Sequence, residues 1–317
     1  MAETTATIAE ITSLEHASLM RTATYASLGV ATFLILLKSG AWIATGSVSM
    51  LSTLVDSALD AGASLVNLLA VRHALQPADR EHRWGHGKAE SLAGLAQSAF
   101  IAGSGLFLLL EVVGRLVTPR PIQQGAWGIG VMVVSIAVTL SLVIFQAYVA
   151  RRSRSLAIKA DAFHYQTDVA SNLAVIGSIL LAGWFGIYAA DPLVALCIVG
   201  YMAYGSIGIA RQALDELMDR ELPDADRQTI RAIAQRHPAV KSVHDLRTRS
   251  SGRNNFIQIH LEMDRGLSLV EAHEISDEVM YNVEAAFPNS EVLIHQDPEG
   301  IEERRDALAS TGTGDAR

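Results

Sequence analysis

Two pairs of acidic and histidine side chains share the spacing that places both members on one face of a helix. Asp56 and Asp60 stand four residues apart, and His164 and Asp168 repeat that spacing much later in the chain. Residues i and i+4 of an α-helix lie one above the other on the same face. Both pairs fall in apolar stretches long enough to cross a membrane, where a carboxylate is costly and marks an ion or proton pathway by default. The spacing predicts that the two pairs face each other around one metal ion.

The donor atoms of these four side chains indicate which metals would suit them. Three carboxylates and one imidazole can close four ligands around an ion, and four-coordination suits Zn²⁺. The imidazole shifts the preference away from Mg²⁺ and Ca²⁺ towards zinc-like metals, and Fe²⁺, Co²⁺ and Cd²⁺ stay compatible. Ligands must be deprotonated to bind, so metal and protons compete for the site, as a metal/proton antiporter requires. The alternative is that these are buried polar groups that pair with helix neighbours, or that one span is amphipathic.

A second cluster lies in the basic loop after the first pair. Asp79, His82 and His86 follow each other at spacings of three and four residues, which is close enough for one ion. Spacing alone is weak evidence here, because a solvated polar loop needs no special explanation.

A third cluster belongs to the C-terminal part of the chain and could bind one or two zinc ions. Its members come from two expected strands, a helix and the end of a last strand: His244, His260, His273, His295 and Asp297. The alternative is a set of unrelated surface histidines, and His16, His73 and His237 fit that description better.

The composition is that of a membrane protein with a soluble part. Of 317 residues, 50% are hydrophobic and only 18% are charged, which is too apolar for an ordinary soluble domain. The formal net charge of −8 argues against a nucleic-acid partner. A lone cysteine, Cys197, excludes a disulfide within the chain and a thiolate metal cluster.

Six apolar spans are expected to cross the bilayer, each near the roughly 20 residues that a crossing helix needs. They cover residues 25–43, 48–71, 89–117, 125–149, 157–185 and 192–209. The loops after the second and fourth spans are rich in basic residues, whereas the loop after the third has only Arg115 and Arg120 and the loop after the fifth has none. This positive-inside bias predicts that both termini are cytoplasmic.

From residue 219 the composition becomes that of a soluble domain. Helices are expected over 224–236 and 268–287, and strands over 240–249, 256–263 and 291–295, in the order αββαβ of a small α+β domain. Ile257, Ile259, Leu261 and Met263 should face the core, with His260 on the other face. The expected parts are an N-terminal lead-in (1–20), a six-helix transmembrane domain (21–212), a cytoplasmic metal-binding domain (213–298) and a disordered tail (299–317).

The chain strongly resembles the cation diffusion facilitator family, and within it the bacterial dimeric zinc/iron efflux antiporters. The resemblance runs from about residue 25 to residue 298. It is carried by SVSMLSTLVDSALDAGASLVNLLAVR, QPADREHRWGHGKAESLAGLAQSAF, KADAFHYQTDVASN, HDLRTRSSG, FIQIHLEMD and LIHQDP.

The resemblance implies a homodimer of six-helix protomers with a metallochaperone-like (ferredoxin-like) cytoplasmic domain. It makes Asp56, Asp60, His164 and Asp168 the transport site, and the loop cluster a second metal site. It also implies that the C-terminal cluster binds a pair of zinc ions, with Asp297 as the bridge. Family members with this set of membrane ligands handle Zn²⁺ and Cd²⁺, and some handle Fe²⁺.

The sequence therefore predicts a secondary transporter rather than an enzyme. It would sit in the inner membrane and export Zn²⁺ in exchange for protons, with Cd²⁺ and Fe²⁺ as alternative substrates. A membrane metalloprotease would need a motif such as His-Glu-x-x-His, which does not occur in the chain. A non-transporting metal sensor has no use for costly carboxylates in lipid.

Overall fold

The computed structural model describes residues 2–117, 126–185 and 190–301. The chain divides into two compact units, which are described separately. The first comprises Met1–Arg220 with Ser250–Asn254, and the second comprises Glu221–Arg249 with Asn255–Arg317. The second unit begins a few residues after the expected domain boundary. Most of the expected tail, residues 302–317, lies outside the described residues.

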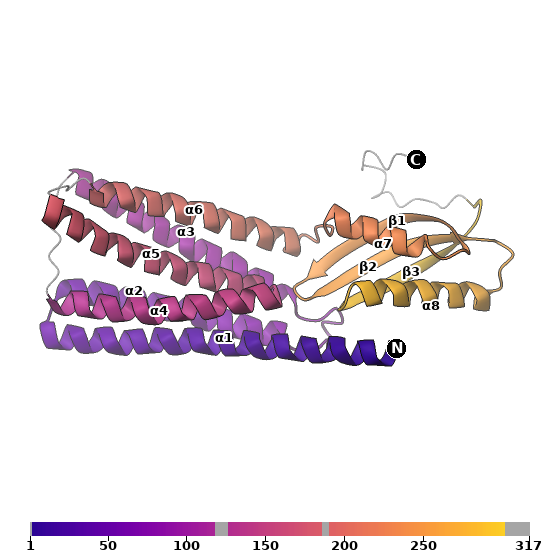
Figure 1. The fold of residues 1–317 in the computed structure, drawn as a ribbon, viewed down its shortest axis with the longest axis horizontal. Coiled ribbons are helices and arrows are strands. Elements are labelled where there is room, and N and C mark those ends of the chain that lie inside the picture. Colours follow the sequence, from indigo (N-terminus) through magenta and orange to yellow (C-terminus); the bar gives the residue numbers. More distant parts are fainter. Residues whose placement is uncertain (1, 118–125, 186–189, 302–317) are drawn as a thin grey trace. The chain divides into compact units, whose positions relative to one another are not determined.

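The first unit is a bundle of long helices (Figure 1). Their bounds are α1 Ala2–Thr45, α2 Val48–Ala74, α3 Lys88–Val117, α4 Ala126–Ser153, α5 Leu156–Phe185 and α6 Ala190–Leu217. Helix α1 begins at Ala2, so the residues expected as a lead-in continue the first span as helix. Helices α1, α2, α3, α4 and α6 each contain a described stretch long and apolar enough to cross a membrane. Helix α5 has 30 residues, about 45 Å at the usual helical rise, which is also enough.

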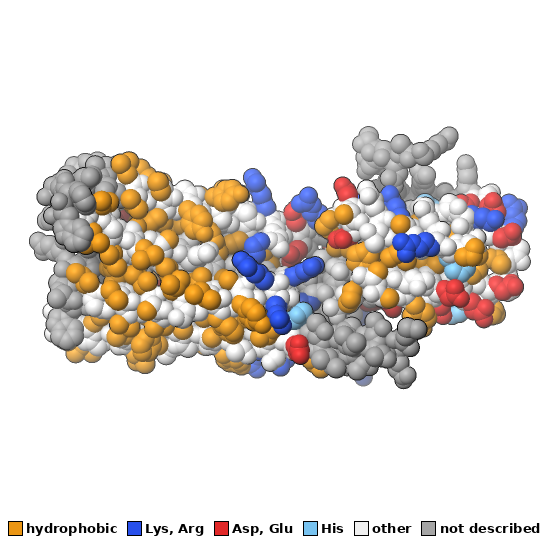
Figure 2. All heavy atoms as spheres, in the orientation of Figure 1, with side chains coloured by type: hydrophobic (Ala, Val, Ile, Leu, Met, Phe, Trp, Pro, Cys, Tyr) orange, Lys and Arg blue, Asp and Glu red, His pale blue; other side chains and the backbone are white. Residues whose placement is uncertain are grey.

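The helices pack in two sets, which are joined by α5 and by the contact of α2 with α3. Helix α1 lies along α2 and α4, and α3 lies along α6. Helix α5 packs against α3, α4 and α6, and it also touches α2. Hydrophobic side chains cover the visible face of this unit, and Lys and Arg side chains gather at one end of it (Figure 2). This distribution is that of a multi-pass membrane protein.

The second unit is a three-stranded sheet with two helices. Its elements are α7 Asp224–Ala234, β1 Val240–Ser251, β2 Asn254–Met263, α8 Leu269–Ala286 and β3 Ser290–Pro298, in the expected order αββαβ. The strand order is β1-β2-β3. Strands β1 and β2 are joined by a two-residue turn, so they are antiparallel. Strand β3 returns parallel to β2 after the crossover through α8.

The core of the second unit lies between the sheet and the two helices. Ile257, Ile259, Leu261 and Met263 of β2 are all buried in it, as the alternation in the sequence predicts. Ile230 of α7 and Val279 and Val283 of α8 complete this core. The side chain of His260 therefore lies on the opposite face of the sheet. The β2–β3 register sets His260 beside His295.

Candidate metal centres

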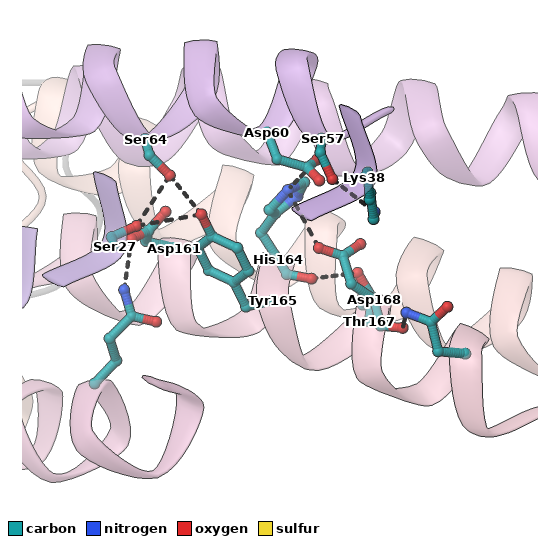
Figure 3. A network of polar contacts seen from close by, with 12 residues as sticks. Ser27, Lys38, Ser57, Asp60, Ser64, Asp161, His164, Tyr165, Thr167 and Asp168 are labelled. Atoms are coloured by element: carbon teal, nitrogen blue, oxygen red, sulfur yellow. Dashed lines mark hydrogen bonds and ion pairs between the residues drawn. The ribbon is translucent and has the colours of Figure 1, made fainter. Parts of the chain in front are cut away.

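The first candidate centre lies between α2 and α5 inside the helical unit. Asp60 comes from α2, and His164 and Asp168 come from successive turns of α5 (Figure 3). The His164 Nε2 atom lies 3.0 Å from Asp60 Oδ1 and 3.6 Å from Asp168 Oδ2. One ligand atom from each residue lies within 4.8 Å of the others. The imidazole is only 4% exposed, whereas the side chains of Asp60 and Asp168 are 23% and 35% exposed. The three groups therefore form a compact nitrogen and oxygen donor set that is buried at its imidazole and open at its carboxylates.

Asp56, the fourth residue predicted for this centre, lies outside that compact group. It is one helical turn before Asp60 on α2 and its side chain is exposed. A carboxylate one turn away can reach a shared ion only through a change of rotamer or a small helix movement. Asp56 therefore remains a predicted ligand, whereas Asp60, His164 and Asp168 lie close together in the structure.

The second candidate centre lies in the loop between α2 and α3. Asp79 Oδ1 is 3.4 Å from His82 Nδ1, and Asp79 Oδ2 is 3.3 Å from His86 Nε2. The backbone N–H groups of His82 and Glu81 donate hydrogen bonds to Asp79 Oδ1. These bonds, the one from His82 first, hold the pKa of the Asp79 carboxyl below its usual value. The carboxylate is thus kept ionised and aimed at both histidines.

The two loop histidines have different surroundings. The side chain of His86 is only 3% exposed, whereas that of His82 is 54% exposed. His86 packs edge-on against the ring of His73, at 4.5 Å between centroids. His73, which the sequence pattern places among the unrelated surface histidines, packs against His86 and has no ligand role in this cluster.

The third candidate centre lies on the open face of the sheet in the second unit. Asp297 on β3 is 6% exposed, and its two oxygens contact imidazoles on all three strands. Oδ2 is 2.9 Å from His260 Nδ1 and 3.2 Å from His244 Nε2, and Oδ1 is 3.2 Å from His295 Nε2. A carboxylate with both oxygens facing imidazole nitrogens is suited to bridge two ions.

Two other residues of this unit differ from the sequence-based expectation. His273 lies apart from the cluster within the protomer; its Nε2 atom is 3.6 Å from Asp277 Oδ2 one turn later on α8, and its side chain is 70% exposed. Asp245, which the sequence analysis did not single out, has Oδ2 3.8 Å from His260 Nε2. Asp245 sits beside His244, and its left-handed backbone (φ 45°) is uncommon for a residue other than glycine. That conformation could not be read from the sequence.

Comparison with known proteins gives the same division into two parts. A family profile described as "Cation efflux transmembrane domain" matches residues 24–218. A second one, described as "Cation efflux protein, cytoplasmic domain", matches residues 222–299. The chain belongs to the cation diffusion facilitator, or cation efflux, family. It is therefore a transporter and not an enzyme.

Individual relatives extend over nearly the whole of this cation diffusion facilitator. The "Cation-efflux pump FieF" of Cronobacter sakazakii is 49% identical over 284 residues, which cover 90% of this chain and 94% of that protein. The protein of the same name from Klebsiella pneumoniae is 48% identical over 286 residues, covering 90% and 95%. Among solved structures, the metal-bound C-terminal domain of the CzcD transporter from Thermotoga maritima is 30% identical, with a TM-score of 0.24, and covers 25% of this chain and 93% of that domain.

Around its first candidate centre, this cation diffusion facilitator has buried polar residues that the sequence analysis missed. Asp161, one turn before His164, is fully buried and accepts a hydrogen bond of 2.5 Å from Gln146 Nε2. The Tyr165 hydroxyl bonds Ser64 Oγ at 2.7 Å (Figure 3). A charged residue inside an apolar span was the available signal for Asp161. These bonds connect α5 to α4 and α2 beside the candidate ligands.

Lys38 is the other residue near this centre that the sequence analysis missed. It lies within the apolar stretch of α1, where a charge is as rare as it is at Asp56 or Asp60. Its ammonium reaches across to α2 and is drawn bonded to Ser57 in Figure 3.

Proposed function

We propose that this protein exports a divalent metal cation from the cytoplasm in exchange for protons, with Zn²⁺ as the preferred substrate. The observation that carries the proposal is the group formed by Asp60, His164 and Asp168, whose ligand atoms lie within 4.8 Å of one another between two long apolar helices. Charged ligands in that setting are costly and are retained for ion passage. Asp56 is the proposed fourth ligand, one turn away on the same face of α2.

The donor set supports zinc over harder ions. One imidazole nitrogen with carboxylate oxygens suits Zn²⁺ and tolerates Cd²⁺ and Fe²⁺, whereas Mg²⁺ and Ca²⁺ prefer oxygen alone. The "Cation-efflux pump FieF" relatives are named for efflux of cations without naming the metal. Cd²⁺ and Fe²⁺ are therefore the alternative substrates to compare with Zn²⁺.

Protons are the proposed counter-ions because metal ligands bind only when deprotonated. A metal ion that arrives at the centre displaces protons, and protons that arrive displace the metal. Alternating access of the centre to the two sides of the membrane turns this competition into exchange. The proton gradient then drives metal out of the cytoplasm.

Flux in proteoliposomes tests this proposal. Purified protein is reconstituted with a metal-sensitive dye inside the vesicles, and a pH gradient of either sign is imposed. Zn²⁺ flux should follow the gradient and should fall by about 100-fold or more in Asp60→Ala, because a ligand of the transported ion is lost. Asp215→Ala, which removes an exposed carboxylate near the end of α6, is the matched control. Zn²⁺ binding without any flux that depends on the gradient would favour the non-transporting sensor.

The basic ends of the helices support the proposed orientation in the inner membrane, with both termini cytoplasmic. Cys197 is the only cysteine, so Cys197→Ser gives a background for single new cysteines. A cysteine placed in the second unit, at the exposed Ala286 at the end of α8, should resist an impermeant thiol reagent added to intact cells. It should react once the cytoplasmic membrane is opened.

We further propose that the protein is a homodimer and that the second unit binds a pair of zinc ions through the cluster around Asp297. The donor set supports this assignment, because both Asp297 oxygens face imidazole nitrogens. Metal there would tighten the dimer and link the cytoplasmic metal level to transport. The double substitution of His260 and His295 by Ala should weaken the dimer or its response to metal, as measured by light scattering. It should leave metal binding at the membrane centre intact; loss of that binding would contradict this division of roles.

A further inference from the structure

Lys38 places a positive charge beside the membrane metal centre from a helix that supplies none of its ligands. Its Nζ atom donates hydrogen bonds to Ser57 Oγ at 2.6 Å and to the carbonyl oxygen of Thr53 at 3.2 Å. Ser57 directly follows Asp56 on α2, within the turn that separates Asp56 from Asp60. Both hydrogen-bond partners are neutral oxygens, so the charge of the ammonium is not cancelled by them.

The ammonium of Lys38 interacts electrostatically with the carboxylates of Asp60, Asp168 and Asp56. Such interactions are strong inside a membrane protein, where little water or salt screens them. A lysine in a membrane span is itself costly, and as a rule it faces the interior of the bundle or a polar pathway. Figure 3 shows Lys38 joined to Ser57 by a hydrogen bond, in the same polar network as Asp60 and Asp168.

The formal charges of the centre give this lysine a specific consequence. Counted over the four predicted ligands alone, three ionised carboxylates with neutral His164 carry three negative charges, and Lys38 reduces them to two. A divalent ion then makes the loaded centre electrically neutral. Without the lysine, the same ion would leave one uncompensated negative charge in a medium of low polarity, and the empty centre would attract cations more strongly.

We propose that Lys38 is a resident counter-charge that sets the affinity and release rate of the membrane centre for divalent cations. Its ammonium cancels the charge of one carboxylate, so the centre binds the metal firmly enough to select it and weakly enough to release it. The inference rests on the proposed transport role of Asp60, His164 and Asp168. Lys38 acts on the metal through this field and is not a ligand.

A purely structural role for Lys38 predicts a different outcome. Its two hydrogen bonds join α1 to α2, so loss of the side chain would lower stability and leave metal affinity unchanged or weaker. Three variants separate the two roles. Lys38→Met removes the charge and keeps the length, Lys38→Arg keeps the charge, and Ser57→Ala removes one hydrogen bond while the charge stays.

Metal titration of the purified full chain measures the affinity. All variants are made in a background protein that also carries Asp79→Ala and Asp297→Ala. These two changes weaken the other two candidate centres, so that the measured Zn²⁺ binding reports on the membrane centre. We expect Lys38→Met to bind Zn²⁺ more tightly by about tenfold, the size of effect that one nearby charge gives when partly screened. Its Zn²⁺ flux in proteoliposomes should fall several-fold, because release slows. Lys38→Arg and Ser57→Ala should both bind Zn²⁺ with the same affinity as the background protein.

Restoring the charge chemically provides a second readout if Lys38→Met folds poorly. In a Cys197→Ser background, Lys38→Cys is treated with a methanethiosulfonate that adds either an ethylammonium group or a neutral methyl group. The ammonium adduct should return the Zn²⁺ affinity towards that of Lys38, and the neutral adduct should not. Equal affinity of the two adducts, or a Lys38→Met affinity that is unchanged or weaker, overturns the inference. Asp60→Ala in the same assays reports separately on the proposed function: if it binds and transports Zn²⁺ normally, that function fails whatever Lys38 does.

Discussion

The Nε2 atom of His164 on α5 lies 3.0 Å from Oδ1 of Asp60 on α2. This contact brings together the two halves of the membrane centre, which stand 104 residues apart in the sequence. In the proposed transport site, the single imidazole is the donor that we expect to decide the choice of metal.

Replacing that imidazole by a carboxylate should change which metals are transported. In His164→Asp the donors become oxygen alone, and hard ions such as Mn²⁺ gain relative to Zn²⁺. We expect the ratio of Zn²⁺ to Mn²⁺ flux in proteoliposomes to fall by about tenfold or more, since nitrogen ligation is lost. His237→Asp is the control, because His237 contacts Glu278 and both belong to the second unit, whereas the membrane centre belongs to the first. An unchanged ratio in His164→Asp would remove His164 from the ligand set.

The close approach of α5 and α6 should make Gly205 intolerant of a side chain. A Cβ atom at Gly205 would lie 1.9 Å from Cζ of Phe163, so Gly205→Ala forces the ring to move and should cost about 1–3 kcal/mol. The melting temperature of the protein in detergent measures this cost. Gly208→Ala is the control, since a Cβ there meets nothing within 4 Å. Adding Phe163→Leu to Gly205→Ala should recover most of the loss; no recovery would mean that the ring is not the obstacle.

The two histidines of the loop centre should respond differently to truncation. His86→Ala removes a buried ring that packs against His73, and should lower the melting temperature as well as metal affinity. His82→Ala removes an exposed ring and should lower affinity alone. Both effects on affinity are expected to be about 10–100-fold. The measurements are thermal unfolding without metal and Cd²⁺ titration in an Asp60→Ala, Asp297→Ala background. Equal melting temperatures would contradict the difference in burial.

The cluster around Asp297 should depend on Asp297 more than on any one of its histidines. Asp297→Asn keeps the size of the side chain and removes its charge, leaving three imidazoles without the carboxylate between them. We expect Zn²⁺ affinity at this cluster to fall by about 100-fold or more, with loss of binding equivalents in titration. Asp277→Asn, which affects only the neighbour of His273 on α8, is the matched control. Retention of both affinity and equivalents in Asp297→Asn would exclude the bridging role.

The first turn of α8 should lose stability in acid because of Glu271. Hydrogen bonds from the Ser268 side chain and backbone lower the pKa of Glu271 in this capping box. The carboxylate therefore stabilises the folded state above its usual pKa of 4.5, and the contribution disappears as the pH falls through the lowered pKa.

Amide exchange of the first turn, read by mass spectrometry in wild type and Glu271→Gln, measures this effect. At pH 7 the variant should exchange faster in peptides that contain residues 269–272. The difference should shrink as the pH drops below 4.5. Glu274→Gln, later in the same helix, is the control; a difference that persists unchanged in acid would assign the effect to something other than ionisation.

Local patterns in the sequence determined much of this protein. Helical spacing within apolar runs placed Asp60, His164 and Asp168 on helices inside the membrane, because i and i+4 share a face whatever the tertiary fold. Strand alternation likewise put Ile259 in the core and His260 on the opposite face. The matched spacing of the two pairs also predicted that they meet around one ion, and the family resemblance assigned the same residues to one site.

Tertiary packing alone decided which of these groups meet. Helical spacing does not fix the rotation of α1 against α2. No local sequence pattern therefore predicts that Lys38 reaches Ser57. Spacing also made Asp56 and Asp60 equally good candidate ligands. In the structure, the rotation of α2 against α5 brings Asp60 next to His164 and Asp168 and leaves Asp56 exposed. His273 is separated from Asp297 for the same reason: α8 packs on the core face of the sheet, and the Asp297 cluster lies on the other.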